Sequence, residues 1–133
     1  MEEEQAGRFR NMTEPEYEAH ALGQKGEEIA LARLKKNKYR IVERNYRLFR
    51  GEIDIIAYDG DTLVFCEVKT RASGEFGRPE ESVTPAKQRQ IRKIAQGYIM
   101  EKGLGDPDCR FDVISIILGD GKECDFRHFP DAF

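Results

Sequence analysis

Apolar and polar positions between residues 13 and 36 follow the period of an α-helix. Thr13 is a typical N-cap residue, and Glu16 stands three residues later, where it can complete a capping box. Gly23 and Gly26 weaken the middle of the segment, so the helix either runs through them or starts afresh near Leu22. The pattern therefore predicts a helix that ends near residue 36.

The apolar face of this helix brings one acid close to the interior. On a helical wheel Glu27 lies about 60° from Ala30, beside that face, whereas Glu28 lies about 160° from Ala30 and faces water. Geometry thus favours Glu27 for a role inside the protein. The face itself comprises Leu22, Gly26, Ile29, Ala30, the stem of Arg33, and Leu34.

Most of the remaining chain carries strand signals. Residues 111–118 form a nearly continuous apolar run, which is typical of a central strand. Thr84 and Pro85 are suited to begin a second helix that reaches residue 102. The other predicted strands cover residues 40–49, 52–58, 63–70 and 124–129. The resulting order is αβββαββ, an α/β (α+β) domain built on one sheet.

A hairpin joins the second and third predicted strands and sets their register. The segment Asp59-Gly60-Asp61-Thr62 is a strong turn signal. A four-residue loop pairs Tyr58 with Leu63 and brings Asp54 opposite Glu67, and a two-residue turn shifts each pair by two positions. Because side chains alternate with period two, either loop leaves Asp54, Glu67 and Lys69 on one face. The opposite face is predicted to hold Ile53, Ile55, Val64, Cys66 and Val68.

These charges lie among apolar residues and need an explanation. Two carboxylates that face each other across a hairpin repel, and burying a charge is costly unless it is paired or bound to a metal. A divalent cation would offset the repulsion, because Mg²⁺ takes carboxylate oxygens and keeps several waters. Asp54, Glu67 and the carbonyl group of Val68 could hold it. Lys69 could orient water or stabilise charge on a phosphate. The alternative is a solvated face in which Glu52 pairs with Lys69.

Charge separates an acidic N-terminal segment from a basic region. Residues 1–12 are predicted to form a disordered acidic tail, and residues 13–133 a single domain. The net charge of −3 hides a cluster over residues 33–50, where eight basic residues stand against one acid, Glu43. That cluster either meets nucleic-acid phosphates or is a solvated helix end and strand edge.

The three cysteines are an odd number without CxxC spacing, which indicates reduced thiols. The N-terminus is acidic and polar rather than typical of a signal peptide, and no apolar run approaches the length of a membrane span. We therefore expect a soluble, cytoplasmic protein.

Several motifs together strongly resemble those of the YraN-like family of predicted endonucleases. They are Gly23-x-x-Gly26-Glu27, Arg44-Asn45-x-Arg47, Gly51-Glu52-Ile53-Asp54-Ile55-Ile56-Ala57, Phe65-Cys66-Glu67-Val68-Lys69-Thr70-Arg71, Lys87 and Arg110-Phe111-Asp112-Val113. The resemblance covers about residues 20 to 133. It implies a restriction-endonuclease-like core, with a mixed sheet flanked by helices, as in Holliday-junction resolvases and PD-(D/E)XK nucleases.

What the resemblance implies is a metal-dependent nuclease that hydrolyses phosphodiester bonds with Mg²⁺ or Mn²⁺. Its catalytic set would be Glu27, Asp54, Glu67 and Lys69, with Thr70 and Lys87 nearby. Residues expected at the nucleic acid are Arg44, Arg47, Arg50, Thr70, Arg71 and Lys87. The expected partner is DNA rather than RNA, in branched or structured form, and a resolvase-like role would call for a homodimer. The rival interpretation is a non-catalytic nucleic-acid-binding or scaffolding module with the same fold.

Overall fold

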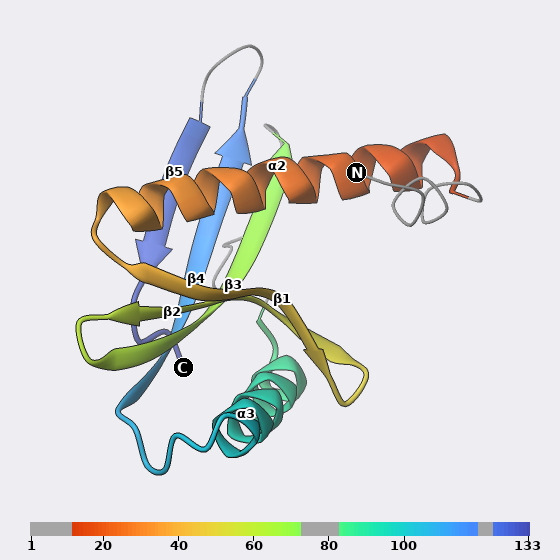
Figure 1. Ribbon diagram of the computed structural model, residues 1–133. Coiled ribbons are helices and arrows are strands. Elements are labelled where there is room, and N and C mark those ends of the chain that lie inside the picture. Colours follow the sequence, from red (N-terminus) through yellow and green to blue (C-terminus); the bar gives the residue numbers. More distant parts are fainter. Residues whose placement is uncertain (1–11, 73–82, 120–123) are drawn as a thin grey trace.

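The computed structural model of the protein has a five-stranded sheet with one helix on each side (Figure 1). It describes residues 12–72, 83–119 and 124–133, so nearly all of the predicted acidic tail lies outside the described residues. The elements are α2 (Glu14–Lys36), β1 (Arg40–Leu48), β2 (Gly51–Asp59), β3 (Thr62–Ala72), α3 (Pro85–Glu101), β4 (Cys109–Leu118) and β5 (Cys124–Phe129). Their order is the predicted αβββαββ.

The helix α2 begins at the predicted capping box. The Glu16 amide donates to Thr13 Oγ1 at 3.2 Å, and the Thr13 amide donates to Glu16 Oε2 at 3.0 Å. Both bonds satisfy amide groups that have no partner within the helix. The helix runs through Gly23 and Gly26 without a break, so a fresh start near Leu22 is wrong.

The sheet is mixed, with the strand order β1-β2-β3-β4-β5. Strands β3 and β4 are parallel, and the other neighbouring pairs are antiparallel. The apolar strand β4 is paired on both sides, as its composition predicts, although β3 is the middle strand. The connection between β3 and β4 includes α3, which is the usual way to join parallel strands.

Each helix covers one face of the sheet, and each face has its own core (Figure 1). The core on the α3 side is built from Ile53, Ile56, Leu63, Phe65, Val83, Ile91, Ile94, Ala95, Tyr98 and Val113. The core on the α2 side is built from Ala30, Leu31, Leu34, Ile55, Ala57, Val64, Cys66, Ile114 and Ile116. A sheet buried on both faces explains why β2 to β4 read as apolar runs.

The β2–β3 hairpin has the predicted register. Tyr58 pairs with Leu63, and Ile56 pairs with Phe65. The turn is tighter than the four-residue loop, because Asp59 also pairs with Thr62 and leaves two residues between them. The antiparallel pairs end at Ile55 and Cys66, one step before the predicted pair of acids.

The predicted position of Ile53 is wrong. The alternating pattern put it on one face with Ile55 and Cys66, but Ile53 packs in the α3-side core whereas the other two pack in the α2-side core. Alternation fails across Asp54, which adjoins Ile55, the last residue of β2 that pairs with β3. Counting by two predicts the face of a side chain only while the strand stays regular.

Candidate functional site

Asp54 lies where the β2–β3 pairing stops. The Val68 amide of β3 donates to Asp54 Oδ2 at 2.7 Å. In a regular ladder that amide would donate to a backbone carbonyl of the neighbouring strand. A side-chain carboxylate thus serves as the acceptor at the point where the two strands part, and this holds Asp54 beside β3.

Electrostatics show which acids surround Asp54. Burial, followed by repulsion from Glu67, raises the pKa of Asp54 to about 8, and the Val68 amide only partly opposes this. Glu27 and Glu52 raise it further. Three acids from α2, β2 and β3 therefore act on one half-buried carboxyl group, and a bound cation would relieve their mutual repulsion.

Glu67 and Lys69 follow in β3 as the strand pattern predicts. The Glu67 side chain is only 8% exposed, and Lys69 Nζ lies 3.5 Å from its Oε1 atom. Residues two apart in a strand point to the same face. The pair of Lys69 with Glu52, which belonged to the alternative of a solvated face, does not form, and Glu52 pairs with Arg47 at 3.3 Å.

Close packing of α2 on β3 brings Glu27 to the sheet. A Cβ atom built on Gly26 would lie 1.8 Å from Thr70 Oγ1, so only glycine allows this approach. The next residue, Glu27, is half-buried, and burial followed by repulsion from Glu52 raises its pKa above the ordinary value. Arg44 and a hydrogen bond from Asn45 oppose that rise.

Asn45 is a member of the site that the sequence analysis did not single out. With its amide oriented to satisfy both acids, its nitrogen donates to Glu52 Oε1 at 2.6 Å and to Glu27 Oε1 at 2.8 Å. Its φ of 51° is left-handed, a conformation that Asn tolerates better than most residues. An Asn within a β-rich run was the available signal, because Asn is depleted in strands.

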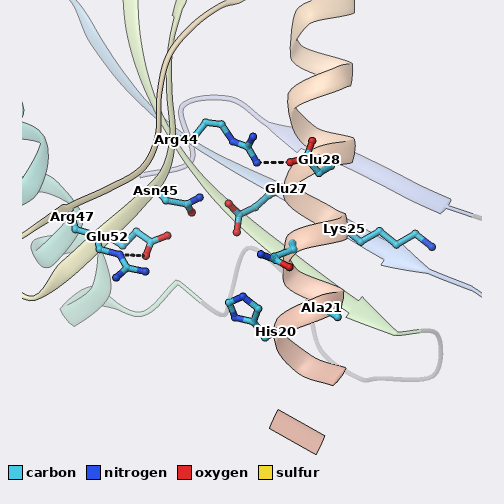
Figure 2. Close-up of a pocket in the computed structure, with 10 residues that line it drawn as sticks. His20, Ala21, Lys25, Glu27, Glu28, Arg44, Asn45, Arg47 and Glu52 are labelled. Carbon is cyan, nitrogen blue, oxygen red and sulfur yellow. Dashed lines mark hydrogen bonds and ion pairs between the residues drawn. The ribbon is translucent and has the colours of Figure 1, made fainter. Parts of the chain in front are cut away.

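Glu27, Asn45 and Glu52 line an open cleft of about 1140 Å³ between α2 and the strands β1 and β2. Asp54, Glu67 and Lys69 are not among the residues that line it. Figure 2 shows Glu27 on the helix facing Asn45 and Glu52 on the strands. Ion pairs join Arg44 to Glu28 and Arg47 to Glu52. The other lining residues are His20, Ala21, Gln24 and Lys25.

The residues expected to bind nucleic acid fall into four places. Arg44 and Arg47 line the cleft just described. Arg47 also lines a smaller groove of about 440 Å³, together with Arg50 and Lys87. Thr70 packs against Gly26 of α2 instead. Arg71 lies near the end of β3, where it pairs in register with Ile117.

The donor set suits a hard cation that keeps its own waters. Within residues 12–72, 83–119 and 124–133, no group of three or more His, Cys, Asp or Glu side chains could hold a metal ion. Mg²⁺ does not need such a cage, because it is usually bound through one or two carboxylates together with water and substrate phosphate. Asp54 and Glu67 offer that number of carboxylates.

Comparison with known proteins places the chain in a family. Residues 26–116 match the Uncharacterised protein family UPF0102. The chain belongs to the UPF0102 family. A UPF0102 protein of Chlorobium limicola is 51% identical over 124 residues, which cover 89% of this chain and 95% of that protein. UPF0102 proteins of Geotalea uraniireducens and Geobacter metallireducens are 51% and 49% identical, each over 85% of this chain and 89% and 92% of their own lengths.

Membership of UPF0102 confirms the resemblance to the YraN-like family, and the α+β fold with its mixed sheet agrees with a restriction-endonuclease-like core. The matched residues include Glu27, Asp54, Glu67 and Lys69. Among the described residues, no helix is both long enough and apolar enough to cross a membrane.

Proposed function

We propose that this UPF0102 protein is a metal-dependent endonuclease that hydrolyses phosphodiester bonds in branched or structured DNA. The observation that carries the proposal is the half-buried Asp54 carboxyl group. It is hydrogen-bonded to the Val68 amide and electrostatically coupled to Glu67 and Glu27. A protein that only needed a stable sheet would gain from an apolar residue at this position.

Mg²⁺ or Mn²⁺ would be held by Asp54, Glu67 and the Val68 carbonyl group. When bound, such an ion polarises a phosphoryl oxygen and lowers the pKa of a coordinated water. Its charge would also favour the ionised form of Asp54, whose pKa burial and Glu67 raise.

Lys69 would act on the reacting phosphate. Its ammonium group lies 3.5 Å from Glu67 and its side chain is 31% exposed, so it is held by the site and still reaches solvent. There it can stabilise the negative charge that grows as water attacks phosphorus. Glu27, with its raised pKa, is a better proton acceptor than an exposed carboxylate would be.

The basic residues supply the path for the nucleic acid. Arg47 lines both the cleft and the smaller groove, so the two hollows adjoin along β1 and β2. Arg50 and Lys87 add positive charge in the smaller groove, which Glu52 also lines. Phosphates bound along this path would lead the strand towards Asp54, and their binding would weaken with added salt.

A cleavage screen tests the proposal. Four-way junction, flap, single-stranded and duplex DNA are incubated with Mg²⁺, Mn²⁺ or EDTA, and single-turnover rates are compared for wild type, Lys69→Ala and Lys102→Ala. We expect metal-dependent cleavage, a rate at least about 100-fold lower for Lys69→Ala, and an unchanged rate for Lys102→Ala, which removes an exposed lysine at the end of α3.

Binding is measured separately in Ca²⁺, where affinity should change only several-fold for Lys69→Ala. Equal rates for Lys69→Ala and wild type would show that the activity comes from elsewhere. Binding without cleavage of any substrate would replace the nuclease with a non-catalytic nucleic-acid-binding module.

A further inference from the structure

The turn between β1 and β2 is costly for the residues that form it. Leu48 pairs with Gly51, so Phe49 and Arg50 are the two turn residues, with φ of 53° and 60°. Two consecutive left-handed residues are typical of a turn that favours Asn-Gly. Holding a non-glycine residue there costs on the order of 1 kcal/mol. A large aromatic side chain and an arginine thus occupy positions where smaller residues would fit better.

The ring of Phe49 is held in place and yet remains accessible. It is 52% exposed. A Cβ atom on Gly97 of α3 would lie 3.1 Å from Phe49 Cε2, so the absence of a side chain at Gly97 lets the ring rest on the helix. Lys93 Nζ lies 4.8 Å from the ring centroid. Packing on α3 fixes the ring position, and half of its surface faces solvent.

Basic residues lie at this aromatic ring and in the neighbouring groove. Lys93 lies over the ring, and the groove that contains the turn residue Arg50 is also lined by Arg47, Lys87 and the acid Glu52. Figure 1 shows the β1–β2 turn reaching out next to α3. An exposed aromatic ring among cations is the combination that binds unpaired bases, because cations hold the phosphates while the ring stacks on the base.

We propose that Phe49 is a stacking platform for an unpaired base, so that the preferred ligand is DNA with a base outside the duplex. This proposal rests on the proposed nuclease function of the site at Asp54. Asp54 lies three residues beyond Gly51, about 10 Å along the strand. At about 3.4 Å per nucleotide, this length corresponds to roughly three nucleotides between the stacked base and the phosphate at Asp54.

Binding assays in Ca²⁺ test the platform. A 30-base-pair duplex and the same duplex with a three-nucleotide bulge are compared, with 2-aminopurine in the bulge as a fluorescent reporter of stacking. In wild type, stacking of the 2-aminopurine base on Phe49 should quench its fluorescence. We expect Phe49→Ala to abolish this quenching and to lower the preference for the bulged duplex by about 5- to 100-fold, the range for one stacked base. Affinity for the plain duplex should change less than about two-fold.

Three further variants separate stacking from folding. Phe49→Leu keeps an apolar contact on Gly97 but lacks a flat ring, so it should behave like Phe49→Ala. Phe49→Trp should retain the preference. Met100→Ala, which removes an exposed apolar side chain from α3, should have the same preference for the bulged duplex as wild type.

The outcomes distinguish this proposal from the nuclease. If wild type cleaves DNA and Phe49→Ala and Phe49→Leu keep both the preference and the quenching, the platform is refuted and the nuclease stands. If no substrate is cleaved but the preference for the bulge depends on a flat ring at this position, the platform stands and the nuclease is refuted.

Discussion

Replacing Asp112 with Asn should remove a large part of the free energy of unfolding. Asp112 is fully buried in β4 and accepts four hydrogen bonds. Arg110 Nε and a second guanidinium nitrogen donate at 2.9 and 3.0 Å, His128 Nε2 lies at 2.7 Å, and the Asp131 amide donates at 3.0 Å. These bonds tie β4 to β5 and to the residues that follow β5.

The expected loss is about 3 to 4 kcal/mol. The Asn side chain keeps one oxygen and replaces the other with an NH₂ group. Two of the four groups that now donate to Asp112 would then face a donor instead of an acceptor. Breaking a buried ion pair by removing one charge costs about 3–5 kcal/mol. The free energy of unfolding of the whole domain is expected to be only about 5–15 kcal/mol. Asp125→Asn is the matched control, because its pair with Arg127 is exposed and should contribute less than about 1 kcal/mol.

The loss should depend on pH with a definite sign. Burial alone would raise the pKa of Asp112, but hydrogen bonds from His128, Arg110 and the Asp131 amide outweigh it and hold the pKa below its ordinary value. The ionised form therefore stabilises the fold above the unfolded pKa of about 4. This contribution disappears as pH falls through the folded pKa, and the difference between wild type and Asp112→Asn should narrow below about pH 4.

Urea unfolding at pH 7 and at a series of lower pH values measures these differences. A cost for Asp112→Asn no larger than that for Asp125→Asn at pH 7 would contradict the prediction. A difference between wild type and Asp112→Asn that stays constant down to pH 3 would show that the ionised carboxylate is not the source of the stability.

Two substitutions at the candidate site, one with a control variant, give further predictions. Gly26→Ala should cost about 2–4 kcal/mol of unfolding free energy and most of any cleavage activity, because its Cβ atom would overlap Thr70. The control Gly23→Ala has open space around its Cβ position and should stabilise α2 by about 0.5–1 kcal/mol, so equal urea midpoints for the two variants would refute the close packing. Asp54→Asn should stabilise the metal-free protein at pH 8 by a few kcal/mol and leave its stability unchanged near pH 4. Because the folded pKa of Asp54 is raised, the wild-type protein keeps its full stability below the unfolded pKa of Asp and loses stability as pH rises towards about 8. A gain for Asp54→Asn that does not grow with pH in EDTA would contradict the raised pKa.

Local signals predicted most of the fold. Thr13 and Glu16 form the capping box that their spacing predicts, and Tyr58 pairs with Leu63, one of the two registers that the turn signal allows. Both depend on residues close together in the chain, where geometry leaves few alternatives. The neighbouring positions of Glu67 and Lys69 followed from the same alternation.

The parts that sequence reasoning missed depend on contacts between distant segments. The face of Ile53 could not be predicted, because the irregularity at Asp54 involves an amide of another strand. The role of Asn45 depends on the approach of α2 to β1, since one of its two acids lies on the helix. The cost of the turn at Phe49 was equally hidden, because a hairpin with favourable turn residues would have the same strand pattern.

The hydrogen bond from Val68 to Asp54 also determines how the carboxylate can meet a ligand. One oxygen, Oδ2, is already engaged at 2.7 Å, so the carboxyl group cannot rotate freely and Oδ1 points in a set direction. A ligand that binds there loses little side-chain entropy, because folding has already restricted the rotamer. Because Oδ2 already accepts the Val68 amide, the carboxylate favours a small ion that contacts a single oxygen over a large ion that binds both oxygens. The point at which the two strands part thus fixes the orientation of the Asp54 carboxylate before any ligand binds.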